Sequence, residues 1–238
     1  MKFHKKTKIF ISFILMQAIL LSLGIWQVQR LAWKEDLLAR IEARKAADAV
    51  LLPAAIKAPE DWEYRRARAA GTFDAAHVFW LKPRTDNGKV GAHMLVLLRR
   101  GDGKLPVFIN RGFVPDDARE KVAVPTAPQT LEGIVQIPHK STFTPDNNPA
   151  KNDWYWPDVQ AMARAVGYQM ALPVIVTLPP HDGGYPAGFA AAAQIRNNHL
   201  QYALFWFGMA GILMLVFALS QREKPANPAN PANPAKTE

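Results

Sequence analysis

The chain has 238 residues, no cysteine and a formal net charge of +9 at neutral pH. The lack of cysteine excludes disulfide bonds, thiol catalysis and metal sites built on thiolates. About half of the excess positive charge lies in the two terminal tails. The one short basic cluster, Tyr64–Arg68, puts Arg66 and Arg68 on one face of a strand, as is ordinary for a solvated sheet. We therefore do not expect nucleic-acid binding.

Two uncharged stretches, Ile9–Gln29 and Leu200–Gln221, lie near the ends of the chain. As helices, both are about long enough to cross the ~30 Å hydrocarbon core of a membrane. Lysines precede the first stretch, and Arg222 and Lys224 follow the second. Because positive charge marks the side that is not translocated, we expect both termini in the cytoplasm and Arg30–Asn198 outside it.

The first stretch is interpreted as a retained anchor. Its apolar run is longer than that of a cleaved signal peptide, and no small-residue cleavage site follows it. A mitochondrial transit peptide would be rich in Arg and Ser, whereas this N-terminus is short and rich in Lys. These features favour a multi-pass protein of a bacterial inner (plasma) membrane with a periplasmic central domain.

The expected organisation has five parts. They are a basic cytoplasmic tail (1–8), a first transmembrane helix (9–29), a periplasmic domain (30–198), a second transmembrane helix (199–221) and a cytoplasmic tail (222–238). The last tail repeats Pro-Ala-Asn and offers no bulky apolar side chain, so we expect it to be disordered.

In chain order, the central domain begins with a helix from Gln29 to about Ala49 that continues the first span. Short strands follow, with a turn at Pro83–Gly88 and one helix at Asp158–Val166. The expected strands are Tyr64–Gly71, Val78–Leu81, His93–Leu98, Val107–Asn110, Leu131–Ile137 and Val174–Leu178. This pattern predicts an α+β domain with a mainly antiparallel sheet or a partly closed barrel, without fixing the strand order. A Gly- and Ala-rich connector then leads from Pro179 to Ala193.

Motifs of known enzyme classes are missing from the sequence. There is no G-x-S-x-G elbow, no H-E-x-x-H, no phosphate-binding loop and no G-x-G-x-x-G that opens a helix. We therefore expect a protein that is not an enzyme. A membrane-tethered periplasmic enzyme would need a carboxylate site that no spacing marks.

Candidate binding residues gather where the two apolar stretches meet the outer side. His199, Tyr202 and Trp206 form one stripe on the second helix, and Trp26 and Arg30 lie four apart on the first. These residues are open to two interpretations. They are interfacial anchors, for which Trp and Tyr are typical, or His199 ligates haem iron through a neutral imidazole nitrogen while arginines pair with the propionates. The candidate cofactor-binding set is His199, Tyr202, Trp206, Arg196, Arg30 and Trp26.

Several motifs in combination carry a family resemblance. They are Leu23-Gly24-x-Trp26-Gln27-x-x-Arg30-x-x-Trp33-Lys34, Glu63-Tyr64-Arg65-Arg66, Gly71-x-Phe73-Asp74, Gly91-x-His93, Asn110-Arg111-Gly112-Phe113-Val114-Pro115, Pro145-Asp146-Asn147-x-Pro149 and Asn197-Asn198-His199-Leu200-Gln201-Tyr202-Ala203. From about Leu23 to Phe207 the chain resembles the surfeit locus protein 1 family, assembly factors of cytochrome c oxidase. Phe113 stands where the family often has Trp. Val96-Leu97 stands where Thr-Pro is common, which weakens a specific role for that loop.

The resemblance implies a role in building the oxidase. Bacterial members of the family are described as binding haem a and helping its insertion into the catalytic subunit, and the proposed ligand matches His199. The implied cofactor is haem a, bound transiently, and the implied partners are cytochrome c oxidase subunit I, haem a synthase and membrane lipid. The alternative is a haem-free membrane scaffold that stabilises an oxidase assembly intermediate.

Three other motif residues have structural interpretations. Gly71 serves a turn or a close approach of two backbones. His93 is a strand residue with a satisfied ring. Arg111 makes either an ion pair on the sheet face or a contact with a partner.

Overall fold

The computed structural model describes residues 2–101, 103–181, 183–188 and 197–222, with side chains from Thr7 onward. These residues form two compact units. One contains residues 2–37 and 197–222, and the other contains residues 38–188. Most of the expected disordered tail, 222–238, and the end of the expected connector lie outside the described residues.

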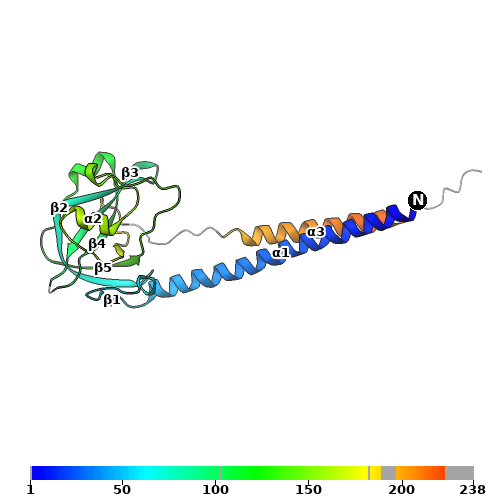
Figure 1. The fold of residues 1–238 in the computed structure, drawn as a ribbon, viewed down its shortest axis with the longest axis horizontal. Helices are drawn as coiled ribbons and strands as arrows, with labels where there is room; N and C mark the ends of the chain where they lie inside the picture. The colour runs from blue at the N-terminus through cyan, green and yellow to red at the C-terminus, as the bar shows by residue number, and fades with distance from the viewer. Residues whose placement is uncertain (1, 102, 182, 189–196, 223–238) are drawn as a thin grey trace, which may run out of the picture. The chain divides into compact units, whose positions relative to one another are not determined.

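The first unit is a pair of helices. Helix α1 spans Lys2–Ala46 and helix α3 spans His199–Gln221, and they lie side by side (Figure 1). Both are long and apolar enough to cross a membrane, which fits a membrane protein. Helix α1 passes Gln29 without a break, so the expected helical continuation of the first span is confirmed, ending a few residues before the predicted Ala49.

Contacts along the two helices show that they run antiparallel. Phe13 stacks on Phe217 with ring centroids 3.9 Å apart, and the Gln17 side chain donates to the Ala210 carbonyl oxygen at 3.3 Å. Further along α1, a Cβ added at Gly24 would meet the Phe207 ring at 2.6 Å. Small residues at such contacts let two helices approach closely, which is how helices associate within lipid.

The second unit is built on a six-stranded sheet. The strands are β1 (Val50–Leu51), β2 (Arg66–Asp86), β3 (Lys89–Arg99), β4 (Val107–Pro115), β5 (Gln129–Gln136) and β6 (Ile175–Thr177). Their order is β1-β2-β3-β4-β6-β5, and β5 also pairs with β2, so five strands form a ring. Among the strand pairings of the described residues, only β1–β2 and β4–β6 are parallel. The expected α+β domain with a mainly antiparallel, partly closed sheet is confirmed.

Smaller elements complete this unit. They are helix α2 (Val159–Ala165) and three 3-10 helices, η1 (Pro59–Asp61), η2 (Asp116–Lys121) and η3 (Pro149–Lys151). The Asp158 side chain caps α2 by accepting from the Ala161 N–H at 3.0 Å, and Gly167 follows with a φ of +84°. The predicted helix and its stop at Gly167 are therefore confirmed.

The sequence predictions for residues 64–88 were wrong in their boundaries. One long strand, β2, contains most of the expected strand Tyr64–Gly71, all of Val78–Leu81 and most of the expected turn Pro83–Gly88. The chain reverses only at Asn87-Gly88, where both φ angles are positive, as in a two-residue hairpin turn. Bulges between Phe73 and Val78 and between Leu81 and Arg84 let a single strand bend where separate strands were expected.

Alternate residues along the strands belong to two different apolar clusters. Met94, Val96 and Leu98 of β3 belong to a cluster that draws on all five strands of the ring. Leu95 and Leu97 belong to a second cluster on the opposite face, together with α2 and the fully buried Trp154. This period of two is the pattern of a sheet that is covered on both faces.

The basic cluster lies on the solvated side, as the sequence indicated. The carboxylate of Glu132 on β5 contacts both arginines, Arg66 and Arg68, and the Arg68 pair is 3.2 Å apart. An acidic residue therefore sits between the two basic ones.

Candidate functional site: His199 and its glutamine partner

The helix pair brings His199 and Gln27 together. Nδ1 of His199 lies 2.7 Å from Oε1 of Gln27, across 172 positions of the sequence. His199 is the first residue of α3. Gln27 is 8% exposed on α1, and the His199 side chain is half-buried. The contact therefore fixes the imidazole ring at the end of the helix pair where α3 begins.

The hydrogen bond also sets the chemistry of the imidazole. An amide oxygen can only accept, so Nδ1 of His199 carries the hydrogen and donates it to Gln27. The other nitrogen, Nε2, then holds the lone pair. A neutral imidazole whose second nitrogen is held by an acceptor is how proteins orient histidine ligands to metals. The pair fits the requirement for one axial ligand to haem iron.

The other predicted site residues lie around this pair without joining it. Trp26 and Tyr202 are about half exposed, and the Trp206 ring packs edge-on against Phe205 with centroids 5.1 Å apart. The Arg30 guanidinium lies over the Trp33 ring at 4.8 Å. Within the described ranges, none of these four predicted residues makes a hydrogen bond or ring contact with His199. Arg196 lies outside the described residues.

The packed face of α3 explains this arrangement. Ala203 and Ala210, four and eleven positions after His199, are buried and lie on the same helix face as His199. Tyr202 falls beside this face and is exposed. Exposed aromatic rings at this position suit lipid headgroups and also suit a flat apolar ligand.

Sequence reasoning did not assign Gln27 to the site. The signal was present, because Gln27 is a polar residue inside an uncharged stretch, and polar residues in membrane helices turn toward a neighbouring helix. Gln17, which comes earlier on α1, follows the same rule.

The three structural interpretations can be compared with the second unit. A Cβ on Gly71 would lie 2.2 Å from the Arg99 carbonyl oxygen, so the close backbone approach is confirmed. Arg111 donates to the Ala123 carbonyl oxygen at 2.9 Å and lies 5.6 Å over the Phe73 ring. His93 lies on β3 with its ring largely buried, and this burial, together with the charge of Arg84, lowers its pKa from 6.5 to about 4.

One further motif is explained by loop structure. The Asn147 side-chain oxygen accepts from the Tyr155 N–H at 2.8 Å, and its amide nitrogen donates to the Trp156 carbonyl oxygen at 2.9 Å. Both ends of the amide are thus used to hold the loop that leads to Pro157 and α2. This accounts for an asparagine at the centre of Pro145–Pro149 without a ligand.

Comparison with known proteins gives a consistent result. Residues 14–211 match the model of the SURF1 family. The chain is 34% identical to Surfeit locus protein 1 of Mus musculus over 220 residues, covering 82% of this chain and 70% of the mouse protein. It is 33% identical to Surfeit locus protein 1 of Homo sapiens over 217 residues, with 79% and 69% covered. It is also 33% identical to the SURF1-like protein of Monosiga brevicollis over 221 residues, with 84% and 83% covered. On the family match and these identities, the chain belongs to the SURF1 family.

Proposed function

We propose that the protein is an assembly factor for cytochrome c oxidase that holds haem a transiently and delivers it to subunit I. The observation that carries the proposal is the 2.7 Å contact between His199 Nδ1 and Gln27 Oε1, which leaves Nε2 as the ligating nitrogen. The role is that of a chaperone without catalysis of its own. Haem a synthase is the corresponding source of the cargo.

The residues around His199 have distinct parts in this proposal. Haem supplies an iron that accepts an axial nitrogen ligand. His199 would hold this iron through Nε2, and Gln27 keeps the imidazole ring in one orientation. Arg30, and Arg196 outside the described residues, would pair with the propionates. Three aromatic residues would pack against the macrocycle: Trp26 and Tyr202, which are exposed, and Trp206, which is half-buried.

Weak retention is part of the function. One axial histidine at an exposed helix end binds haem less firmly than a buried site with two axial ligands. A carrier has to release its cargo, so an open site is suited to transfer. In this proposal the site lies at the outer surface of a bacterial inner membrane, with the sheet domain in the periplasm.

A haem-free scaffold is the second candidate, and one observation favours it. The His199–Gln27 hydrogen bond also satisfies two polar side chains between two apolar helices, which stabilises the pair without any ligand. In that case His199 is structural, and the sheet domain alone contacts an oxidase intermediate.

Purification from cells that make haem a separates the two candidates. We expect wild-type protein to carry haem a, and His199→Ala to lose most of it while still inserting into the membrane. His77→Ala is the matched control, because His77 lies exposed on β2, where it pairs with Asp74. Arg30→Ala and Arg196→Ala should weaken retention less, since ion pairs at an exposed site are screened by water.

Each outcome has a clear meaning. Full haem occupancy in His199→Ala, with an unshifted Soret band, would show that another group is the ligand. Wild-type protein that carries no haem when haem a is present would favour the scaffold.

A further inference from the structure

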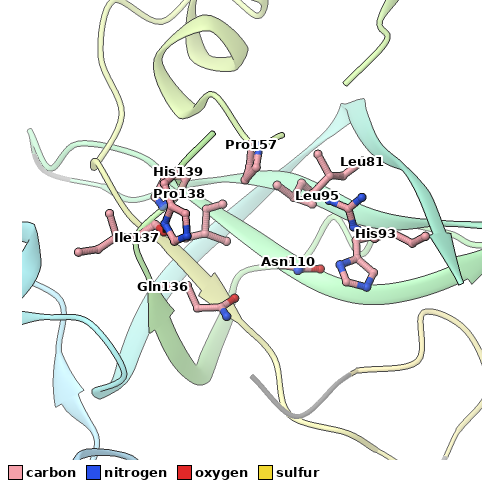
Figure 2. Close-up of a pocket in the computed structure, with 11 residues that line it drawn as sticks. Leu81, His93, Leu95, Asn110, Gln136, Ile137, Pro138, His139 and Pro157 are labelled. Atoms are coloured by element: carbon pink, nitrogen blue, oxygen red, sulfur yellow. The ribbon is translucent and has the colours of Figure 1, made fainter. Parts of the chain in front are cut away.

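The sheet domain contains a cavity to which every strand of the ring contributes. Its volume is about 260 Å³. Leu81, Leu95 and Ile175 of the second apolar cluster are among its lining residues, which Figure 2 shows as sticks. Arg84 of β2, His93 of β3, Asn110 of β4, Gln136 of β5 and Ile175 of β6 line it. The volume is below the ~300–1,000 Å³ usual for drug-sized ligands. The cavity therefore admits a small molecule and excludes a macrocycle.

A bulge in β2 brings Arg84 into the cavity. Leu81 and Arg84 are three positions apart, which in a regular strand would put their side chains on opposite faces. The pairing shifts between them, from Leu81 opposite His93 to Arg84 opposite Gly91. The extra residue turns Arg84 to the same face as Leu81, and both side chains line the cavity.

A second bulge lies on β4 next to Asn110. The pairing passes from Met94 opposite Gly112 to Leu95 opposite Asn110, which leaves Arg111 as the extra residue. Bulges are frequent next to functional sites because they redirect a side chain. Here two of them meet at one cavity.

The amide side chains present donors to the cavity. Oδ1 of Asn110 accepts from the Gly112 N–H at 3.1 Å, and Oε1 of Gln136 accepts from the Thr177 hydroxyl at 2.5 Å. With both oxygens engaged, the NH₂ groups are the ends that can donate to a ligand. Figure 2 shows Asn110 between His93 and Gln136 in this view.

The charge in the cavity is positive. Arg84 donates to the carbonyl oxygens of Pro83 at 2.7 Å and Tyr155 at 3.4 Å, and in the part of the chain that the structure describes no carboxylate pairs with it. Burial lowers the pKa of this guanidinium, which still remains charged at neutral pH. No Asp or Glu is among the residues that line the cavity. A half-buried cation without a counter-charge is costly, and an anion would offset that cost.

We propose that this cavity binds a small organic carboxylate with an apolar stem. The planar guanidinium of Arg84 matches a carboxylate, which can take two parallel hydrogen bonds from it. Gln136 and Asn110 donate to the same group. Leu81, Leu95 and Ile175 line the rest of the cavity and suit the stem. His93 and His139 both line the cavity. Among the described residues no group of three or more His, Asp or Glu could hold a metal ion, so these two histidines are not interpreted as a metal site.

The test uses the full chain in detergent micelles, titrated with butyrate and followed by NMR shifts of the histidine rings. Butyramide is the uncharged probe of the same shape, and inorganic phosphate is the anion without a stem. We expect saturable binding of butyrate and at least about tenfold weaker binding of butyramide, because charge-assisted bonds are the stronger kind. Arg84→Gln should weaken butyrate binding by about tenfold or more, and Arg99→Gln, at an exposed position of β3, should leave it unchanged.

A second variant keeps the test decisive if Arg84→Gln does not fold. Gln136→Glu preserves the acceptor for the Thr177 hydroxyl but replaces the NH₂ donor by a negative charge, so butyrate binding should again fall by about tenfold or more. Absence of saturable butyrate binding in the wild-type protein would overturn the proposal. Butyrate binding that neither variant weakens would also overturn the proposal. Tighter binding of phosphate than of butyrate would overturn the choice of a carboxylate and indicate a phosphate-type ligand.

Discussion

Gln27 and Gln17 are two buried glutamines on the same helix with different partners. Gln27 accepts from a histidine ring, whereas Gln17 donates to a backbone carbonyl oxygen. If haem binds His199, replacing Gln27 removes the group that orients the ligand, and such losses typically reduce metal affinity by about 10–100-fold. We therefore expect Gln27→Leu to lower the ratio of haem a to protein and to shift the Soret band.

Gln17→Leu is the matched control for this change. It removes an equally buried amide from the same helix pair, yet it should leave haem content and spectrum as in the wild type. Equal haem loss in both variants would indicate that the amides act only through packing of the two helices.

His93 makes the stability of the sheet domain depend on pH. Its pKa falls from 6.5 to about 4 in the folded state, through burial and the nearby charge of Arg84. Between these values the unfolded chain binds more protons than the folded one, so stability is full above about pH 6.5 and is lost as the pH falls toward 4. The loss contributed by His93 is on the order of 3 kcal/mol.

Urea unfolding of the full protein in micelles at pH 7 and pH 5 measures this effect. We expect His93→Gln to flatten the pH dependence, because glutamine does not titrate in this range. His77→Gln, at an exposed position, should retain the wild-type slope. A slope that is unchanged in His93→Gln would assign the acid sensitivity to other groups.

At the scale of elements, the β2–β3 pairing depends on Gly71. The Arg99 carbonyl oxygen would lie 2.2 Å from an added Cβ, and backbone cannot move aside as the end of a side chain can. We expect Gly71→Ala to destabilise the domain by about 1–3 kcal/mol, the usual cost of overpacking. Gly101→Ala should be close to neutral, since nothing lies within 4 Å of the added methyl group. Chemical denaturation compares the free energies of unfolding of the two variants. Equal denaturation midpoints would mean that β2 and β3 accommodate the added methyl group at Gly71 without loss of stability.

The elements that were predictable from sequence are those with a periodic pattern or a turn residue. The apolar stretches predicted α1 and α3, and Asp158 and Gly167 predicted the two ends of α2. The long β2 was not predictable in this way, because its bulges break the alternation that identifies a strand. The closure of the ring was also out of reach, since the β2–β5 pairing joins residues such as Arg68 and Glu132, far apart in the chain.

The candidate site was likewise predictable only in part. His199 was recognisable from its place at the end of an apolar stretch and from the family motif. Its contact with Gln27 depends on which faces of α1 and α3 meet, and that choice depends on small residues such as Gly24 and Ala203 that fit against the opposite helix. The cavity of the sheet domain could not be predicted from the sequence, because Arg84 faces it only as a result of the bulge in β2.

At the scale of the whole molecule, each of the two units is stabilised by different forces. The sheet domain is stabilised by two apolar clusters that water drives together. The helix pair exposes large apolar side chains, among them Ile14, Leu15, Leu204 and Leu215. Lipid tails solvate such side chains as well as another helix does, so packing and the glutamine hydrogen bonds have to hold α1 to α3.

The orientation of this membrane anchor is the last prediction. Because positive charge marks the side that is not translocated, we expect the lysines before Ile9 and the basic residues after Gln221 on the cytoplasmic side and the sheet domain on the other side. We expect an alkaline phosphatase fusion at Gly101 to be active and fusions at Lys5 or Pro228 to be inactive, because this reporter folds only outside the cytoplasm. Fusions of green fluorescent protein should give the reverse pattern and control for expression. An inactive phosphatase at Gly101 combined with an active one at Pro228 would invert the topology and would put His199 at the cytoplasmic surface, where a periplasmic handover of haem to the oxidase could not take place.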